Sequence, residues 1–349
     1  MFQVTGASTC AQTRESKSSP HIATVGTLRI LLVVNSFASS VTARNTVIVH
    51  RRLSRGHDVE VVETNRRGHA TRFAHDAARR GIDVVIGFGG FASFPGALMA
   101  VARNIPLVVH NLDAKPGLAN RVLRFGADRV LTGFPGVLGE GRDPRVEWVG
   151  NPLRADIVAA LPPEDRFAGR SGPLTVLVVG GSLGAVALNE CVPRALALMP
   201  PGARPVVTHQ AGEKHIDALV AEYERAGVAA ECVAFIADMG RRYAEADVVI
   251  ARSGATTVAE LAAVGAASVL VPYPHAADDH QVDNARQLAD RGASVLILQR
   301  DLSPEGLAAW LGSVTRGQLL AMAQAARALR RADAVARVAD VCIELGSRQ

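Results

Sequence analysis

The feature that most constrains this chain is a repeated alternation of short apolar runs, turns and longer helical patterns. In the first half, apolar runs at 28–34, 59–62, 83–86 and 106–109 are separated by arginine-rich helical stretches. Apolar runs of this length are typical of strands buried on both faces, and helices between such strands form the crossover connections of a parallel sheet. This half is therefore predicted to be a doubly wound α/β domain.

The second half of the chain repeats the pattern, with apolar runs at 174–179, 205–208, 247–250, 267–271 and 294–297. Prolines and glycines concentrate at 150–172, where the alternation stops and restarts, so this stretch is predicted to separate two domains. The expected organisation is a disordered leader at 1–26, an N-terminal α/β domain at 27–150, a linker at 151–172 and a C-terminal domain with terminal helices at 173–349. The fold class is α/β, with two doubly wound domains facing a ligand-binding cleft.

Composition excludes several classes of protein. The 349 residues are 48% hydrophobic and 20% charged, which is typical of a globular chain, and no apolar run reaches the length of about 18 residues that a membrane-spanning helix needs. The net charge of +5 comes from dispersed arginines, which argues against nucleic-acid binding and leaves a weak attraction to an anionic membrane surface. The cysteine spacing indicates neither disulfides nor a metal site, which fits a reducing cytoplasm.

The clearest local motif is Gly-Gly-Ser-Leu-Gly-Ala at 180–185, between a predicted strand and a predicted helix. Glycines in such a turn let the backbone approach a diphosphate closely, and the helix N-terminus supplies unpaired N–H groups and a positive dipole end. A tight strand-to-helix turn without a ligand explains an isolated glycine cluster equally well.

A second motif, Ser-Gly-Ala-Thr-Thr-Val-Ala-Glu at 253–260, also follows a predicted strand and opens a helix. Small residues at the turn let a ligand lie against the backbone, and the Glu260 carboxylate can accept hydrogen bonds from two vicinal ribose hydroxyls. The alternative is a helix whose first turns merely carry a carboxylate that favours the helix dipole.

A third motif lies at 272–285 and reads Pro-Tyr-Pro-His-Ala-Ala-Asp-Asp-His-Gln-Val-Asp-Asn-Ala. His280 and Gln281 stand side by side after a strand and offer donors and acceptors suited to sugar hydroxyls, although a solvated polar loop is the simpler interpretation. The adjacent aspartates lack the ligand spacing of a metal site, so a metal-free site is expected.

These three motifs, in this order, closely resemble the donor half of the MurG family, the N-acetylglucosaminyltransferases that make the lipid-linked disaccharide-pentapeptide precursor of peptidoglycan. The resemblance runs from about residue 83 to the C-terminus. It also includes the segments 87–96, 116–121, 150–154 and 235–239.

The resemblance implies a GT-B fold whose cleft holds UDP-N-acetylglucosamine, with no metal and no other cofactor. It implies that Ser182 and its glycines hold the diphosphate, that the 235–239 segment holds the uracil and that Glu260 holds the ribose. Arg154 approaches the nucleotide from the hinge, and Gln281 with His280 contacts the sugar. The implied donor-binding set is Arg154, Gly181, Ser182, Ile236, Met239, Ser253, Ala255, Thr256, Thr257, Val258, Ala259, Glu260, His280 and Gln281.

The implied reaction is an inverting displacement, in which the 4-hydroxyl of undecaprenyl-diphospho-muramoyl-pentapeptide attacks the anomeric carbon and UDP leaves. Helix N-termini, rather than a metal, are expected to meet the charge on the leaving group. The resemblance also implies a peripheral protein at the cytoplasmic face of the inner membrane. Its roles there are in peptidoglycan synthesis, cell wall biogenesis, cell shape and cell division.

The chain departs from this family near its N-terminus. The family's glycine-rich loop with a histidine is replaced by Asn-Ser-Phe-Ala-Ser-Ser at 35–40. Residues 28–86 resemble instead the start of a diacylglycerol-type lipid kinase, through the segments 33–38, 63–70 and 81–85. That kinase family needs a Gly-Gly-Asp-Gly-Thr loop next, whereas residues 89–93 read Gly-Gly-Phe-Ala-Ser.

A general base must reach the attacking hydroxyl, and with the loop histidine absent the nearest candidates by position are His110 and Asp113. They lie in His-Asn-Leu-Asp at 110–113, where the family carries His-Glu-Gln-Asn. A histidine at the end of a buried strand is also well explained as a structural residue. The candidate acceptor-binding residues are Gly89, Gly90, Phe91 and Asn120.

Two other functions stay open at the level of the sequence. The first is a UDP-sugar-binding protein without transferase turnover, because both departures fall on the catalytic and acceptor side. The second is a lipid kinase-like protein, which the missing aspartate of the kinase loop disfavours.

Overall fold

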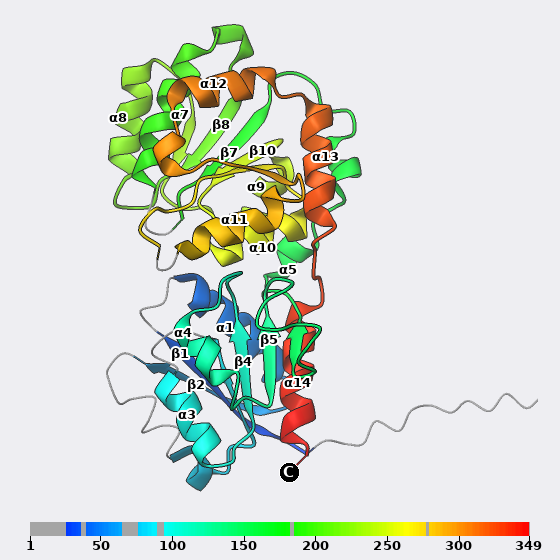
Figure 1. The fold of residues 1–349 in the computed structure, drawn as a ribbon. Coiled ribbons are helices and arrows are strands. Elements are labelled where there is room, and N and C mark those ends of the chain that lie inside the picture. The colour runs from blue at the N-terminus through cyan, green and yellow to red at the C-terminus, as the bar shows by residue number, and fades with distance from the viewer. Residues whose placement is uncertain are drawn as a thin grey trace, which may run out of the picture.

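The computed structural model describes residues 26–35, 40–64, 76–88, 94–181, 185–276 and 279–348. These residues form two stacked α/β domains, each built around a six-stranded sheet (Figure 1). Every strand pair in the two sheets is parallel, as buried strands joined by crossover helices require. The predicted fold class, two doubly wound α/β domains, is confirmed.

The first sheet has the strand order β2-β1-β3-β4-β5-β6. Four of its strands match the apolar runs of the sequence, and the other two are short strands that the runs did not predict. The strands are β1 (Arg29–Asn35), β2 (Asp58–Thr64), β3 (Val84–Gly87), β4 (Leu107–Asn111), β5 (Arg129–Thr132) and β6 (Val146–Trp148).

The second sheet has the order β12-β11-β10-β7-β8-β9, in which the chain moves outward in both directions from the central pair β7 and β10. Five strands match predicted apolar runs, and the edge strand β9 does not. The strands are β7 (Thr175–Val179), β8 (Val206–Gln210), β9 (Glu231–Val233), β10 (Val248–Ala251), β11 (Ser268–Leu270) and β12 (Ser294–Leu296).

Helices cover both faces of each sheet. In the first domain they are α1 (Ser40–Leu53), η1 (Ala78–Arg80), α3 (Phe94–Ala102) and α4 (Leu118–Leu123). Two short helices, α5 (Ala155–Val158) and α6 (Pro163–Phe167), follow. The remainder are α7 (Val186–Leu198), η2 (Pro201–Ala203), α8 (Ile216–Ala226), α9 (Met239–Glu245), α10 (Ala255–Val264), α11 (His280–Ala289), η4 (Gln299–Asp301), α12 (Pro304–Ser313), α13 (Arg316–Arg327) and α14 (Ala334–Gly346).

The last helix does not stay with the second domain. Figure 1 shows α14, in red, alongside the first domain, where it packs against α1 and β3. Its buried residues Val338, Val341 and Cys342 join the apolar cluster formed by Leu28 and Ile30 of the first sheet. The expected C-terminal domain at 173–349 therefore differs from the structure in its final helix, because an apolar face on α14 is buried by the N-terminal sheet.

The predicted linker at 151–172 contains the short helices α5 and α6 and packs against the second domain. Ile157 of α5 is fully buried in an apolar cluster that includes residues of both domains. The Arg166 guanidinium donates hydrogen bonds to the carbonyls of Val264 and Gly265 in the second domain. The segment is therefore fixed to the second domain by polar and apolar contacts.

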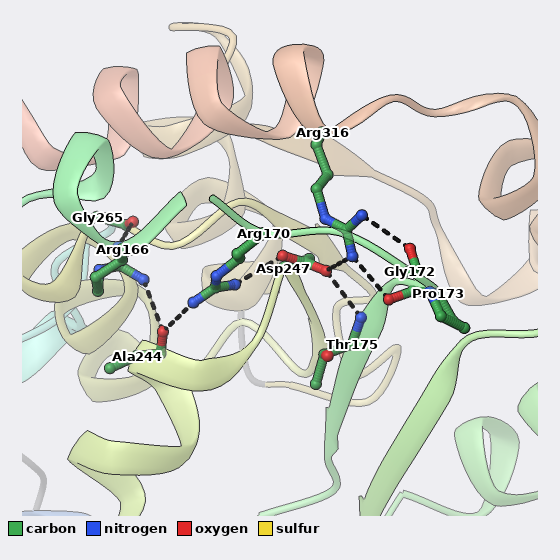
Figure 2. A network of polar contacts seen from close by, with 9 residues as sticks. All are labelled: Arg166, Arg170, Gly172, Pro173, Thr175, Ala244, Asp247, Gly265 and Arg316. Carbon is green, nitrogen blue, oxygen red and sulfur yellow. Dashed lines mark hydrogen bonds and ion pairs between the residues drawn. The ribbon is translucent and has the colours of Figure 1, made fainter. Parts of the chain in front are cut away.

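Asp247, just before β10, is the centre of a buried ion network (Figure 2). Arg170 of the linker lies 2.7 Å from one carboxylate oxygen, and Arg316 of α13 lies 3.1 Å from the other. The Thr175 N–H also donates to Asp247, at 2.9 Å, and Arg316 donates to the carbonyls of Gly172 and Pro173. The network joins the end of the linker, the start of β7 and the start of α13 at the amino edge of the second sheet.

Several sequence predictions lie outside the described residues. These are the leader except for Gly26, most of the loop after the first strand, the 89–93 loop with the candidates Gly89, Gly90 and Phe91, and Ser182 of the glycine motif.

Candidate functional site

The second sheet places the first two motifs next to each other. Its strand order reverses between β7 and β10, so the loops that leave these strands start side by side at the carboxyl edge of the sheet. Crevices at such a reversal are where open α/β sheets bind ligands. The glycine motif follows β7, and the 253–260 motif follows β10.

The described part of the glycine motif is anchored by Gln210 at the end of β8. The Gly181 N–H donates to the Gln210 side-chain oxygen at 3.2 Å, and the Gln210 amide donates to the carbonyls of Gly181 and Ala234. Gly181 has φ +76°, a left-handed conformation that favours glycine. The turn that leads into the predicted diphosphate loop is thereby held in one orientation.

The N-terminus of α10 has a glycine at its N-cap position. Gly254 caps the helix without a side-chain hydrogen bond, so the first-turn N–H groups of Ala255, Thr256 and Thr257 have no cap from that residue. The side chain of Val258 is fully buried in the core, and only its backbone belongs to the helix start. An uncapped helix N-terminus with its dipole is suited to an anion.

Ser253 does not present its hydroxyl to the cleft. Its side chain is fully buried, and the hydroxyl donates to the Gln281 carbonyl of α11 at 2.7 Å. The contact fixes the start of α10 relative to α11. Ser253 therefore arranges the two helices that carry predicted donor residues.

Glu260 lies in the second turn of α10, half-buried, with its carboxylate oriented by Tyr243 of α9. The Tyr243 hydroxyl donates to one Glu260 oxygen at 3.1 Å. Burial, together with the neighbouring carboxylate, raises the pKa of Tyr243 well above its ordinary value, so the hydroxyl keeps its proton and remains a donor. The carboxylate is thus held in place by a hydroxyl that keeps its proton.

Arg154 lies where the linker meets the predicted uracil segment. Its guanidinium donates to the Ala237 carbonyl at 3.4 Å and lies 3.4 Å from Asp156. The neighbouring Ile236 is buried, and Met239 begins α9. The structure therefore joins Arg154 to the segment that contains Ile236 and Met239 through the Ala237 carbonyl.

Gln281, in the first turn of α11, also has a fixed orientation. Its side-chain oxygen accepts a hydrogen bond from the Tyr273 N–H at 3.0 Å. The side-chain amide nitrogen is therefore the group that can donate hydrogen bonds to a ligand. Arg252 holds the 271–273 turn by donating to the carbonyls of Val271 and Pro272 and to the Gln299 side chain. His280 is half-buried beside Gln281.

On the first domain, His110 is fully buried at the end of β4. One ring nitrogen, Nε2, lies 3.1 Å from the Gly150 carbonyl, and the ring stacks edge-on against Phe88. Burial lowers its pKa to about 4, so the ring is neutral at pH 7 and Nε2 donates to the carbonyl. These contacts fit the structural interpretation, because a fully buried ring does not reach a substrate hydroxyl in this arrangement.

The other candidates on this side form a polar cluster after β4. The Asn120 amide donates to Asn111 at 2.8 Å, and both side chains are buried. Asp113 is half-buried, and its carboxylate accepts a hydrogen bond at 2.9 Å from Asn284 of α11, across the domain interface. Asp113 is therefore the candidate that the fold places at the cleft.

Four residues that the sequence analysis gave no role hold the predicted ones in place: Gln210, Tyr243, Arg252 and Asn284. Asn284 lies inside the third motif, whereas Gln210 stands two residues after the predicted strand 205–208, so position marked only Asn284 for attention. Tyr243 is one of three tyrosines in the chain. Within the described ranges, no group of three or more His, Cys, Asp or Glu side chains gathers where it could hold a metal ion.

Comparison with known proteins decides the family. The glycosyltransferase family 28 C-terminal domain matches residues 175–338. The UDP-N-acetylglucosamine–N-acetylmuramyl-(pentapeptide) pyrophosphoryl-undecaprenol N-acetylglucosamine transferase of Burkholderia multivorans is 56% identical over 264 residues, which are 74% of this chain and 71% of that protein. The protein of the same name from Aromatoleum aromaticum is 58% identical over 265 residues, 76% of this chain and 73% of the relative. The chain belongs to the MurG family.

A solved structure of the MurG family supports this assignment along nearly the whole chain. The crystal structure of Acinetobacter baumannii MurG matches with a TM-score of 0.78 and 28% identity, over 91% of this chain and 99% of the other. The glycotransferase of kitacinnamycin matches with a TM-score of 0.62 at 17% identity, over 91% and 99%, which shows the shared fold alone. The GT-B architecture implied by the sequence is therefore confirmed.

The N-terminal part of the chain also matches a second family, as its departure from the MurG pattern indicates. The diacylglycerol kinase catalytic domain matches residues 29–107, from the start of β1 to the start of β4. The match includes the 28–86 segment in which the sequence resembles a lipid kinase. The donor half of the chain thus follows the glycosyltransferase pattern, and the first strands of the other half follow a second family.

Proposed function

We propose that this chain transfers N-acetylglucosamine from UDP-N-acetylglucosamine to the 4-hydroxyl of undecaprenyl-diphospho-muramoyl-pentapeptide. The observation that carries the proposal is the arrangement of the three donor motifs. The first two leave the second sheet side by side at the strand-order reversal, and the third is joined to the second by the hydrogen bond from Ser253 to the Gln281 carbonyl, in a chain whose relatives carry that activity in their names. The family's expected roles in cell wall biogenesis, cell shape and cell division would follow from this reaction.

The donor nucleotide would lie across the carboxyl edge of the second sheet. Glu260, held by Tyr243, would accept hydrogen bonds from the ribose hydroxyls, because a carboxylate can accept from two vicinal O–H groups. Arg154 and the segment around Ile236 would border the uracil. The Gln281 amide nitrogen would donate to the sugar, since its oxygen is already engaged by Tyr273.

The leaving group would be UDP, and its developing charge falls on the diphosphate. The first turn of α10 supplies N–H groups and the positive end of a helix dipole at the place where the diphosphate would lie. Gln210 holds Gly181, the residue that precedes the proposed diphosphate loop. Attack by the acceptor hydroxyl from the opposite face of the sugar would invert the anomeric configuration.

A peripheral position at an anionic membrane surface is supported by a patch of exposed apolar side chains on α3 and α4, which pack against each other, and just after α4. In the described chain no helix is long and apolar enough to cross a membrane. The patch consists of Leu98, Leu118, Val122 and Phe125, whose side chains are 46–70% exposed. Arg124 lies over the Phe125 ring at 4.8 Å, which places a cation beside the apolar surface. Apolar side chains bordered by arginine are suited to a membrane with acidic headgroups at the cytoplasmic face.

The membrane proposal is tested by sedimentation with vesicles of anionic phospholipid. Phe125→Asp should reduce binding, because it removes apolar contact area and adds a charge that the headgroups repel. Leu161→Asp is the matched control, since Leu161 is a comparably exposed leucine in the linker and not on the patch. Equal loss of binding in both variants would contradict the assignment of this patch.

A second candidate function is binding of the UDP-sugar without turnover. The diacylglycerol kinase match over 29–107 favours it, because the acceptor side of the cleft is built on those strands. Isothermal titration with UDP-N-acetylglucosamine tests what both candidates share, namely a donor site of micromolar or better affinity. No binding would overturn both, and turnover with a soluble acceptor analogue separates them.

A further inference from the structure

Asn284 of α11 makes hydrogen bonds to both domains. Its side-chain oxygen accepts the Ala114 N–H at 2.7 Å, and its amide nitrogen donates to Asp113 Oδ1 at 2.9 Å. The same nitrogen donates to the Ser253 carbonyl at 3.2 Å. Two of these contacts cross from the second domain to the loop that follows β4 in the first domain, and the third reaches the turn before α10.

The burial of Asn284 makes these contacts specific. Its side chain is 0% exposed, so its amide group depends on these protein partners for its hydrogen bonds. The three hydrogen bonds engage both amide protons and the carbonyl oxygen. An apolar residue of similar size in this place would remove both hydrogen bonds that join α11 to the Asp113–Ala114 loop.

The contacts also join the two sides of the proposed reaction. Figure 1 places α10 and α11 on the face of the second domain that is turned toward the first. Gln281, one turn before Asn284, faces the proposed sugar position, and Ser253 starts the helix proposed for the diphosphate. The 113–114 loop belongs to the domain that would hold the acceptor.

We propose that Asn284 is a positioning residue that holds the Asp113–Ala114 loop of the first domain against the donor helices. This proposal rests on the proposed glycosyl transfer for its consequence in catalysis, although the closed arrangement itself does not depend on turnover. Asp113 acts in it as a hydrogen-bond acceptor for Asn284. The reaction geometry then depends on the Asn284 contacts, because a displaced acceptor loop separates the attacking hydroxyl from the anomeric carbon.

The alternative role of Asp113, a general base, makes a different demand on its side chain. A base needs the carboxylate, whereas the contact with Asn284 needs only an oxygen that accepts a hydrogen bond. Asp113→Asn keeps such an oxygen and removes the charge. Asp113→Ala removes the acceptor and leaves every contact inside the second domain intact.

The experiment compares Asp113→Ala, Asp113→Asn and Asn284→Ala with the unaltered full-length chain. Small-angle X-ray scattering with saturating UDP-N-acetylglucosamine gives the radius of gyration, which rises when the domains separate. The kinetic assay gives kcat and KM for a soluble acceptor analogue, and thermal unfolding checks the fold. Asp283→Ala is the control, because Asp283 is the preceding residue of α11 and its ion pair, with Arg286, lies within that helix.

We expect Asp113→Ala and Asn284→Ala to enlarge the radius of gyration and to lower kcat/KM for the acceptor on the order of 10²-fold. Asp113→Asn should keep the compact form and restore most of the lost kcat/KM, and Asp283→Ala should match the unaltered chain. An Asp113→Ala variant as compact as the unaltered chain would overturn the proposal, and so would an Asp113→Asn variant that behaves like Asp113→Ala. Absence of turnover in the unaltered chain would refute the proposed function, while the scattering result would still decide the role of Asn284.

Discussion

Glu260 lies in the second turn of α10, and a buried tyrosine fixes the direction of its carboxylate. Gln281 is oriented in the same way by the Tyr273 N–H. Both predicted side chains were recognisable in the sequence because they stand in motifs that follow strands. Their hydrogen bonds were not, because no local sequence pattern marks Tyr243 or the Tyr273 N–H as the partner of these side chains.

Removal of the Glu260 carboxylate should weaken UDP binding by about 1 to 3 kcal/mol, since two hydrogen bonds to a charged group are lost. Tyr243→Phe should weaken it by about 1 kcal/mol, because the carboxylate stays but loses its orienting donor. Isothermal titration with UDP measures both. Glu245→Ala, on the same helix as Tyr243, is the control, and unchanged affinity in Glu260→Ala would refute the ribose assignment.

His110 gives a prediction about pH. Burial holds its pKa in the folded state at about 4, below the value of about 6.5 in the unfolded chain. Between these pH values the unfolded chain binds a proton at His110 that the folded chain does not. The contribution of His110 to the free energy of unfolding is therefore fully present above pH 6.5 and is lost as the pH falls toward 4. His110→Gln should show a smaller loss of Tm between pH 7 and pH 5 than the unaltered chain. An equal loss would mean that His110 does not contribute.

At the scale of elements, the sequence predicted most strands, including the edge strands β2 and β12, and missed β5, β6 and β9. β3 and β10 are continuous apolar runs because both of their faces are covered. β6 and β9 have three residues each and carry glutamates, since strands at the sheet edge are partly exposed. Short strands of this kind have no periodicity that could distinguish them from loops.

The ion network around Asp247 gives a prediction for the elements that it joins (Figure 2). Asp247→Asn should destabilise the second domain by about 3 kcal/mol, because the Arg170 and Arg316 guanidinium groups lose a buried partner. Thermal unfolding measures the change. UDP affinity of the folded variant should be retained, since the network lies at the opposite edge of the sheet from the donor site. A variant with unchanged Tm would show that the network contributes little.

At the scale of the whole molecule, the chain crosses between the domains twice. The linker passes to the second domain, and the segment before α14 returns to the first. The sequence predicted the first crossing from its prolines and glycines. The second could not be predicted, because an amphipathic helix does not specify which of two sheets it will cover.

The return of α14 predicts an effect far from the substituted residue in the sequence. Val338→Asp buries a charge in the cluster that contains Leu28 and Ile30, so it should destabilise the first domain. Hydrogen exchange should speed up at β1 and β3 while β7 and β10 stay protected. Faster exchange confined to the second domain would contradict this division of the molecule.

The joining of a lipid-kinase-like start to a glycosyltransferase donor half makes turnover the central question. The most direct measurement is transfer of labelled N-acetylglucosamine from its UDP donor to a soluble analogue of undecaprenyl-diphospho-muramoyl-pentapeptide. We predict release of UDP and a disaccharide product of inverted anomeric configuration. A chain that binds the donor but forms no product, under conditions in which a MurG relative does, would contradict the proposed transfer.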